Sequence, residues 1–359
     1  MKTIRNISII MISILGIAIL FANGLILPVS ELTTISAATY QTTNSSTSSL
    51  GVFYYSWGGG NAEVSPTNTW RYWSDDGHNP PNTWASNYLP DYVPGFNPNK
   101  DLYSAKDTNV IKWQLGLMKK SGINFVISSW WGQNHYTDQA LDIIFNKVMP
   151  DPSNPYPDAK FAIYYEKEGF ANVSKSEIIS DINYIKNKYM SSRYYYTIDG
   201  RPVVFVYNTA GGLYGETNIQ EAQKWKEVRD ETGIYLVLKV FADYKSYIGL
   251  SDSWHQYSPA MNYDIQGNYS AFVSPGFYKW NEQPRLARDN FVRFENDIKN
   301  LKDANVQFKL IETWNEWGEG TGIEPAQKIN HDDINGFSEL EPSYGTRYVD
   351  IIAKYFNPT

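Results

Sequence analysis

Short runs of β-branched and aromatic residues alternate with longer helical patterns along most of this chain of 359 residues. A strand, a helix and a second strand in succession form a βαβ unit, in which the two strands pair in parallel. Seven or eight such strands in one chain predict an α/β fold of the (β/α)8 TIM-barrel class. The expected strands cover residues 51–56, 124–129, 160–165, 202–207, 235–241, 260–265, 270–274 and 308–313.

The apolar spacing between these strands predicts the helices, and one connection stands out by its length. Residues 58–107, after the first strand, are rich in Pro, Asn and Trp and exceed an ordinary connection. Loops after the strands build the active face of such barrels, so we expect a walled cleft beside the first strand. Residues 50–359 are then a single barrel domain. The expected helices cover residues 108–121, 137–148, 175–189, 219–232, 285–303 and 345–356.

The N-terminal segment has the composition of a targeting signal. Two basic residues precede an apolar run over residues 7–27, and a cleavage-like Ser-Ala-Ala site ends at Ala38. The pattern predicts a signal peptide over residues 1–38, or an uncleaved anchor, because the apolar run nearly spans a bilayer. Residues 39–49 are rich in Ser and Thr, which predicts a solvated linker. We expect a secreted or cell-surface protein that contacts a membrane only if the segment is uncleaved.

The composition excludes several classes of partner. A net charge of −7 gives no basic surface for a nucleic-acid backbone. The chain has no cysteine, which excludes disulfides and thiolate-bound metals, and its four histidines lack the spacing of a helical metal site. We therefore expect a monomer that uses no cofactor and no metal. Aromatic residues make up 16% of the chain, and flat rings with polar edges suit sugar binding as well as core packing.

Two glutamates directly follow the last expected strand. Glu316 and Glu319 lie where barrel enzymes place catalytic side chains, and a coiled loop turns residues three apart toward one cleft. Cleavage of a glycosidic bond requires two converging carboxyl groups, one of which protonates the departing oxygen. The alternative is a pair of solvated loop acids. The period of two along a strand places Glu312, Trp314 and Glu316 on one face, with Glu312 inside the barrel.

The segment around these acids resembles a known family. Residues 314–326 read Trp-Asn-Glu-Trp-Gly-Glu-Gly-Thr-Gly-Ile-Glu-Pro-Ala. This block is similar to one in glycoside hydrolase family 99 and its relatives, the endo-acting α-mannosidases and α-mannanases. Further matches follow in the same order along the chain, so the resemblance extends from Gly51 to about Ala326. They lie at residues 54–57, 129–132, 166 and 200–203.

The resemblance implies a glycoside hydrolase that cleaves α-linked, mannose-containing glycans of a polysaccharide or a glycoprotein. Glu319 is then the general acid and later the general base, and Glu316 deprotonates the sugar 2-hydroxyl. The implied route passes through a 1,2-anhydro sugar with net retention, while spacing alone leaves a direct carboxylate nucleophile or an inverting pair open. The residues expected to bind substrate are Tyr54, Tyr55, Trp57, Trp130, Trp131, Glu166, Tyr269, Asn315 and Glu324.

The chain departs from the family pattern at three places. Gly318 stands where the family commonly has His, and Gly322 stands where it has Gln. Lys167 follows Glu166 in place of Pro, so the two side chains can form an ion pair instead of a sugar site. These departures leave two further functions open. One is a surface glycan-binding protein on the same barrel that no longer hydrolyses, and the other is a glycosidase of another linkage.

Several of the aromatic residues have core packing as a second interpretation. Trp130 and Trp131 end a strand, where a ring either stacks on a sugar or fills the core. Strand alternation sends either Tyr54 or Tyr55 away from the cleft. We expect Tyr55 to be the one that faces it.

Overall fold

Residues Ser46–Thr359 form one compact unit. The segments expected to be a signal peptide and a linker lie outside the described residues, except for Ser49. Within the part of the chain that the structure describes, none of the helices has the length and apolar character needed to cross a membrane. The computed structural model describes residues 49–59, 71–77, 86–90, 102–169, 173–207, 218–240, 242–279, 282–288, 291–328 and 344–357.

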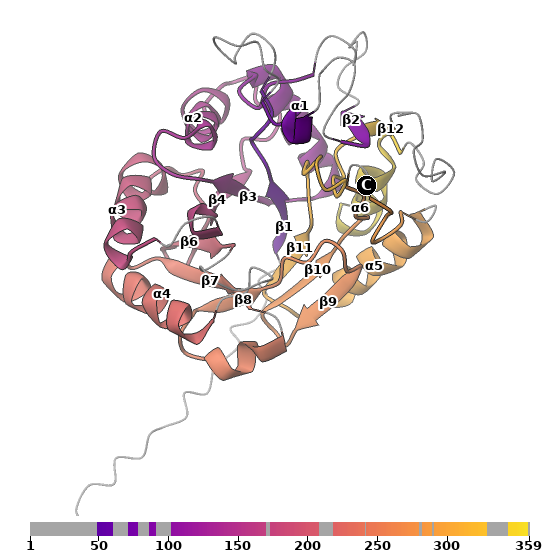
Figure 1. Ribbon diagram of the computed structural model, residues 1–359. Coiled ribbons are helices and arrows are strands. Elements are labelled where there is room, and N and C mark those ends of the chain that lie inside the picture. The colour runs from indigo at the N-terminus through magenta and orange to yellow at the C-terminus, as the bar shows by residue number, and fades with distance from the viewer. Residues whose placement is uncertain are drawn as a thin grey trace, which may run out of the picture. The chain divides into compact units, whose positions relative to one another are not determined.

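Eight strands pair in parallel and curl into a nearly closed barrel, with the helices outside it (Figure 1). Their spatial order is β8-β7-β6-β4-β3-β1-β11-β10, and among the described residues no hydrogen-bonded ladder joins β8 to β10. The strands are β1 (Ser49–Tyr54), β3 (Phe125–Trp130), β4 (Lys160–Tyr165), β6 (Arg201–Val206), β7 (Tyr235–Lys239), β8 (Ser253–His255), β10 (Ser270–Val273) and β11 (Phe308–Ile311).

Alternate side chains of these strands fill the inside of the barrel. Phe53 of β1 packs 4.8 Å from the ring of Tyr164 in β4, and Phe205 of β6 packs 5.3 Å from the ring of Phe308 in β11. All four side chains are fully buried. The interior below the strand ends is therefore a solid aromatic core, and a ligand site has room only above it.

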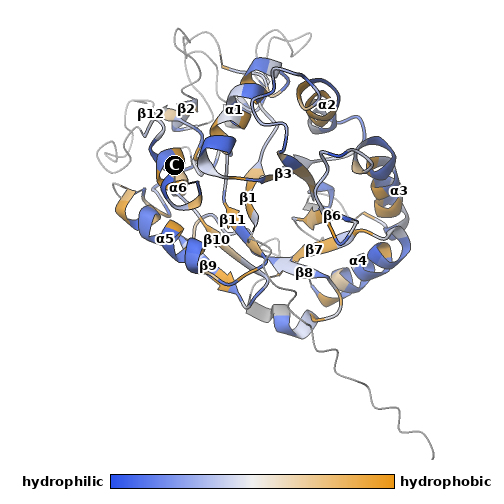
Figure 2. Cartoon of the chain, turned by 180° about the vertical axis from the view of Figure 1, so that it is seen from behind, coloured by the Kyte–Doolittle hydropathy of each residue, from blue (hydrophilic) through white to orange (hydrophobic). Residues whose placement is uncertain are grey.

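Amphipathic helices cover the outside of the barrel. Figure 2 shows hydrophobic and hydrophilic residues along the same helices, and in α4 the buried positions are Ala222, Trp225, Val228 and Thr232. This spacing of three and four residues turns one helical stripe toward the strands. The helices are α1 (Thr108–Ser121), α2 (Tyr136–Ile143), α3 (Lys175–Ile185), α4 (Ile219–Thr232), α5 (Val292–Asp303) and α6 (Arg347–Phe356), with π-helical turns Ile144–Val148 and Lys186–Met190 extending α2 and α3.

The prediction of the sixth parallel strand at residues 260–265 was wrong. The sixth parallel strand is β8, whose three residues are too few to produce a readable alternation. The predicted segment contributes β9 (Tyr263–Gln266), which runs antiparallel to β10. The chain therefore departs from a regular (β/α)8 repeat. A 3-10 helix (Ala242–Tyr247) joins β7 to β8, and β9 takes the place of a helix before β10.

The expected helix over residues 285–303 begins later than predicted, at Val292. Its first part is extended instead, because Leu286 forms an antiparallel bridge with Phe277 after β10. That bridge turns the chain back toward the open end of the barrel. Arg288, two residues further on, is thereby buried beside the loop that follows β11.

The long connection after β1 contacts the loop after β11. It contributes a 3-10 turn (Asp75–Gly77) and strand β2 (Tyr88–Pro90), which pairs antiparallel with β12 (Ala326–Lys328). A further short strand, β5 (Thr197–Ile198), pairs with β6. The β2–β12 ribbon joins the two loops that follow the neighbouring strands β1 and β11, and both of these loops supply residues to the site described next.

Candidate active site

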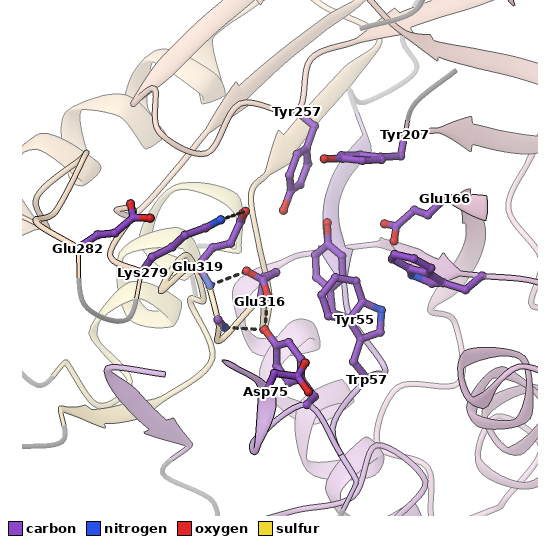
Figure 3. A pocket seen from close by; sticks show the side chains of 13 residues that line it. Tyr55, Trp57, Asp75, Glu166, Tyr207, Tyr257, Lys279, Glu282, Glu316 and Glu319 are labelled. Atoms are coloured by element: carbon purple, nitrogen blue, oxygen red, sulfur yellow. Dashed lines mark hydrogen bonds and ion pairs between the residues drawn. The ribbon is translucent and has the colours of Figure 1, made fainter. Parts of the chain in front are cut away.

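A cavity of about 580 Å3 lies above the carboxyl ends of the strands. Its walls come from the loops after seven of the parallel strands, including the long connection after β1, because parallel strands bring all such loops to one end of the barrel. Figure 3 shows Glu316 and Glu319 on one side of this pocket and Glu166 on the other. The lining residues are Tyr55, Trp57, Tyr72, Asp75, Trp131, Glu166, Tyr207, Tyr257, Lys279, Glu282, Glu316, Gly318 and Glu319.

The loop after β11 is a tight, internally bonded turn. The Gly320 N–H donates to the Trp317 carbonyl at 3.0 Å, and the Thr321 N–H donates to the Glu316 carbonyl at 3.2 Å. Gly320 has a φ of +62°, and a Cβ there would lie 2.4 Å from the Tyr278 carbonyl oxygen, so only glycine fits. The turn brings the side chains of Glu316 and Glu319 to the same cavity.

The Glu316 carboxyl accepts a hydrogen bond on each oxygen. The Tyr72 hydroxyl donates to Oε1, and the Glu319 backbone N–H donates to Oε2 at 2.7 Å. Burial, and after it the neighbouring carboxyl of Glu319, raises the pKa of Glu316 to about 8, and the two donors act against that rise. The two hydrogen bonds therefore stabilise the ionised form of a group that burial and its neighbour would otherwise keep protonated.

Glu319 has fewer partners than Glu316. Its Oε1 lies 3.6 Å from the Lys279 ammonium, and its Oε2 has no hydrogen-bond partner among the described residues. Burial raises the pKa of Glu319, and Lys279 opposes that rise. Figure 3 shows Lys279 reaching toward Glu319 from the loop after β10. The Glu319 side chain lines the cavity and is 27% exposed, so its carboxyl can contact a ligand there.

Arg288 supports the glutamate loop from below. Its guanidinium donates to the carbonyls of Gly320 at 2.6 Å and Gly322 at 3.0 Å. The guanidinium carbon also lies 4.4 to 4.9 Å from the ring centres of Tyr88, Tyr344 and Tyr348. A buried cation with these contacts fixes the backbone that carries the two carboxyls.

Replacing Arg288 with Met should lower the free energy of unfolding by about 3 kcal/mol, because two charge-assisted hydrogen bonds are lost and two carbonyls are left buried. Chemical denaturation measures this difference. The matched control is Arg193→Met, since Arg193 also lies over a tyrosine ring but is exposed, and its loss should cost under about 1 kcal/mol. Equal stabilities of the two variants would contradict the role given to Arg288.

Ser129 connects the two tryptophans of the site to Glu166. The indole N–H groups of Trp57 and Trp131 donate to Ser129 Oγ at 2.8 and 2.9 Å, and Ser129 donates to Glu166 Oε2 at 2.9 Å. Burial raises the pKa of Glu166 to about 8, and its Oε1 has no hydrogen-bond partner among the described residues. Lys167 pairs with Asp181 at 2.9 Å and not with Glu166.

Three of the residues expected to bind substrate lie in the core or pack against it instead. Trp130 is fully buried and donates to Asp138 at 3.0 Å, so core packing was its correct interpretation. Tyr54 points away from the cavity and donates to Gln114, while Tyr55 lines the cavity as strand alternation requires. Tyr269 packs against the hydrophobic core after β9, because that strand belongs to the hairpin with β10.

Asn315 and Glu324 also lie outside the cavity. The Asn315 side chain accepts from the Tyr55 N–H at 2.8 Å and donates to the Tyr55 carbonyl at 2.9 Å, which fixes the end of β1. Glu324 is fully buried and accepts from Tyr103 and Gln114 at 2.7 and 2.6 Å. Burial raises the pKa of Glu324 to about 7. Both side chains therefore stabilise loops around the site.

Glu312 lies inside the barrel as expected, fully buried, with Oε2 accepting from the Ser258 N–H at 2.8 Å. Trp314 does not share its face. It belongs to the core between strands and helices and donates to Glu324, because β11 ends at Ile311 and the period of two ends with it.

Sequence reasoning missed several residues of the cavity wall. Tyr257 follows β8, which was not predicted, and Tyr207 is the first residue after β6. The position of Tyr207 at the end of a predicted strand was a usable signal. Tyr72 and Asp75 lie within the long connection after β1, and Lys279 and Glu282 follow β10, where no local pattern marks them.

A second cavity of about 610 Å3 adjoins the first. The two share Glu319, Lys279, Tyr207 and Tyr257, so Glu319 stands at their boundary. In the part of the chain that is described, no group of three acidic or histidine side chains is arranged to hold a metal ion. His255 is fully buried next to Tyr164, and burial lowers its pKa well below the ordinary value.

Paired carboxyls beside an aromatic wall, at the carboxyl end of a parallel barrel, are the arrangement that glycoside hydrolases use. The family model of glycosyl hydrolase family 99 matches residues 46–279, and the chain belongs to that family. The match ends before Glu316. The assignment to the family therefore rests on the first seven parallel strands and the start of the loop after β10, independently of the glutamate loop.

Two curated relatives are glycoprotein endo-alpha-1,2-mannosidases. The protein of Xenopus laevis is 24% identical over 285 residues, which are 69% of this chain and 60% of that protein. The protein of Mus musculus is 22% identical over 324 residues, 77% of this chain and 68% of that one. The chain thus spans only about three fifths of the length of the first relative.

Two solved structures of a family 99 endo-alpha-mannosidase from Bacteroides thetaiotaomicron share the fold. One superposes with a TM-score of 0.62 at 19% identity and covers 85% of this chain and 96% of the other. The second, in complex with bis-tris propane, gives a TM-score of 0.64 at 19% identity over 86% and 96% of the two chains. At this identity the likeness establishes the fold alone.

Proposed function

We propose that this protein hydrolyses α-linked, mannose-containing glycans with Glu319 as general acid and base and Glu316 as the partner base. The observation that carries the proposal is the unequal environment of two neighbouring carboxyls on one cavity. Glu316 accepts two hydrogen bonds, which favour its ionised form, whereas Glu319 has the Lys279 ammonium 3.6 Å from Oε1 and no hydrogen-bond donor on Oε2 among the described residues. Because the two groups interact, their protons come off in steps that belong to the pair.

The proposed first step breaks the glycosidic bond. Glu316 takes the proton of the sugar 2-hydroxyl, and the 2-oxygen attacks the anomeric carbon from the opposite side. The electron pair of the glycosidic bond goes to the departing oxygen, which receives the proton of Glu319. The products of this step are a 1,2-anhydro sugar, the released glycan, a neutral Glu316 and an ionised Glu319.

The proposed second step restores both carboxyls. Glu319 takes a proton from water, whose oxygen attacks the anomeric carbon. The bond from that carbon to the 2-oxygen breaks, and Glu316 returns its proton to the 2-oxygen. Two inversions at the anomeric carbon give net retention.

The two adjoining cavities support an internal cut. Glu319 belongs to the walls of both, so a sugar in each cavity would place the bond between them beside this acid. Trp57 and Trp131 line the first cavity with aromatic rings that suit a sugar, and the Glu166 carboxyl lines it with acceptors for a hydroxyl. The names of the relatives favour the glycan of a glycoprotein as substrate.

We further propose that the protein is exported through its N-terminal segment and acts as a monomer. Mass analysis of the protein from the culture medium should find a chain that begins near Thr39. A chain that retains residues 1–38 in the membrane fraction would instead identify an anchor.

The decisive experiment incubates the protein with an α-mannan and with a glycoprotein N-glycan. Mass analysis of the products should find shorter oligosaccharides, and proton NMR of the first product should find the α-anomer. The β-anomer would overturn the retaining route. Binding of either glycan without any product would favour a glycan-binding protein, and cleavage only of other linkages would overturn the substrate class.

A further inference from the structure

The segment Arg71–Trp73, from the long connection after β1, is held on both sides of Tyr72. Arg71 lies 3.2 Å from the imidazole Nε2 of His135, and its carbonyl accepts from the Gly59 N–H at 3.2 Å. Trp73 is buried, with its ring centre 6.1 Å from that of Trp317 in the glutamate loop. Tyr72 itself has a φ of +70°, a backbone conformation that residues other than glycine rarely adopt. Its side chain lines the first cavity.

This strained position brings the Tyr72 hydroxyl to the glutamate loop. The hydroxyl donates to Glu316 Oε1 and accepts from the Gly318 backbone N–H at 2.5 Å. A Cβ at residue 318 would lie 3.0 Å from the same hydroxyl oxygen and 3.5 Å from Glu316 Oε1. Gly318 thus leaves room for the hydroxyl at the place where a side chain would compete with it.

We propose that Tyr72 is the positioning residue of Glu316, whose carboxylate it stabilises and orients toward the cavity, and that Gly318 is glycine so that this contact can form. The proposal rests on the proposed function for the role of Glu316 as a base. It adds that the loop after β1 supplies a part of the catalytic apparatus.

Other charged and titratable groups around the cavity also affect the pKa of Glu316. Removing the Tyr72 hydroxyl leaves all of them in place, so the change in the pKa of Glu316 reports on one hydrogen bond. That hydrogen bond lowers the pKa of Glu316, and its loss should raise it. The groups that face the cavity beside Glu316 are Glu319, Lys279, Glu282, Glu166, Asp75, Tyr55, Tyr207 and Tyr257.

The first test compares the pH dependence of kcat/KM for the wild type and Tyr72→Phe. A base must be ionised, so a raised pKa of Glu316 should move the acidic limb of the profile to higher pH. We expect a loss of about 10- to 100-fold on the acidic side, the effect of one hydrogen bond to a charged group. The loss should shrink as the pH rises, and kcat should fall more than KM changes.

The matched control is Tyr156→Phe, because Tyr156 is half-buried between α2 and β4, away from both cavities. It should keep the wild-type profile. An equal loss for Tyr72→Phe at every pH, with an unmoved acidic limb, would overturn the proposal and leave Tyr72 with a merely structural role.

A second pair of variants tests the part of Gly318. Gly318→Ala places a methyl group against the Tyr72 hydroxyl and should reproduce the shift of the acidic limb in part. In the Tyr72→Phe background the same change should add little, because the hydroxyl it displaces is already gone. Fully additive losses would separate Gly318 from Tyr72 and overturn that part of the proposal.

A measurement that needs no turnover separates this proposal from the proposed function. Glutamate labelled with 13C at the carboxyl gives NMR titrations of single side chains, and Glu316→Gln identifies the resonance of Glu316 by its loss. A higher pKa of Glu316 in Tyr72→Phe supports the contact even if no glycan is cleaved. An unchanged pKa overturns it even if the wild type is an active hydrolase.

Discussion

Glu319→Gln should reduce hydrolysis of an α-mannan by roughly a thousandfold or more, because an amide can neither protonate the departing oxygen nor take a proton from water. Glutamine has nearly the same shape, and the Glu319 side chain is about one quarter exposed, so the fold should tolerate the change. Initial rates from reducing-end release measure the loss. Thermal unfolding should change by only a few degrees.

Glu227→Gln on α4 is the matched control for this substitution, since Glu227 is an exposed partner of Lys175 outside both cavities. It should keep the wild-type rate. An unchanged rate of Glu319→Gln would remove Glu319 from the mechanism. So would a wild-type rate of this variant on a substrate whose leaving group needs a proton. On a substrate with an activated leaving group, which needs no proton, the variant should regain part of the rate of the first step.

Glu316→Gln should also reduce the rate of α-mannan hydrolysis by roughly a thousandfold, for a different reason. The amide cannot take the proton of the 2-hydroxyl. In the wild type the Glu319 backbone N–H donates to Glu316 Oε2 at 2.7 Å, and an amide NH2 group placed there would face this donor without accepting from it. An activated leaving group should give no recovery here, because the missing step is the attack of the 2-oxygen. Comparing the two variants on both kinds of substrate measures this contrast.

The substrate itself provides the control for Glu316. A 2-deoxy analogue lacks the attacking oxygen and should be inert to the wild type, while the analogue that carries the 2-hydroxyl is cleaved. A 2-fluoro analogue that leaves a sugar ester on Glu316, detected by mass analysis of the peptide, would establish Glu316 as a direct nucleophile. That result would contradict the proposed route.

The fold was predictable from the sequence wherever an element was long enough to show its period. The β4 strand and the α1 and α4 helices have the predicted bounds, and seven of the parallel strands overlap their predicted segments. The β8 strand failed because its three residues show no alternation, and the neighbouring β9 offered a more conspicuous pattern.

The site was predictable only near strand ends. Glu316, Glu319, Glu166 and Trp131 line one cavity because each follows a parallel strand, and such loops meet at one end of a barrel. Asn315 and Trp130 have the same local signature yet point into the protein, since the direction of a side chain beyond a strand depends on its loop. Tyr72 gave no signal, because its position depends on contacts with residues far along the chain.

The two hydrogen bonds between Tyr55 and Asn315 determine when the site can form during synthesis of the chain. The two residues lie 260 positions apart, so the hydrogen bonds between Tyr55 and Asn315 can form only after β11 has been made. Contacts of such long range form late and slowly, because a large loop must close first. A nascent or truncated chain is consequently without a working centre, and catalysis begins only when nearly the whole polypeptide has left the ribosome.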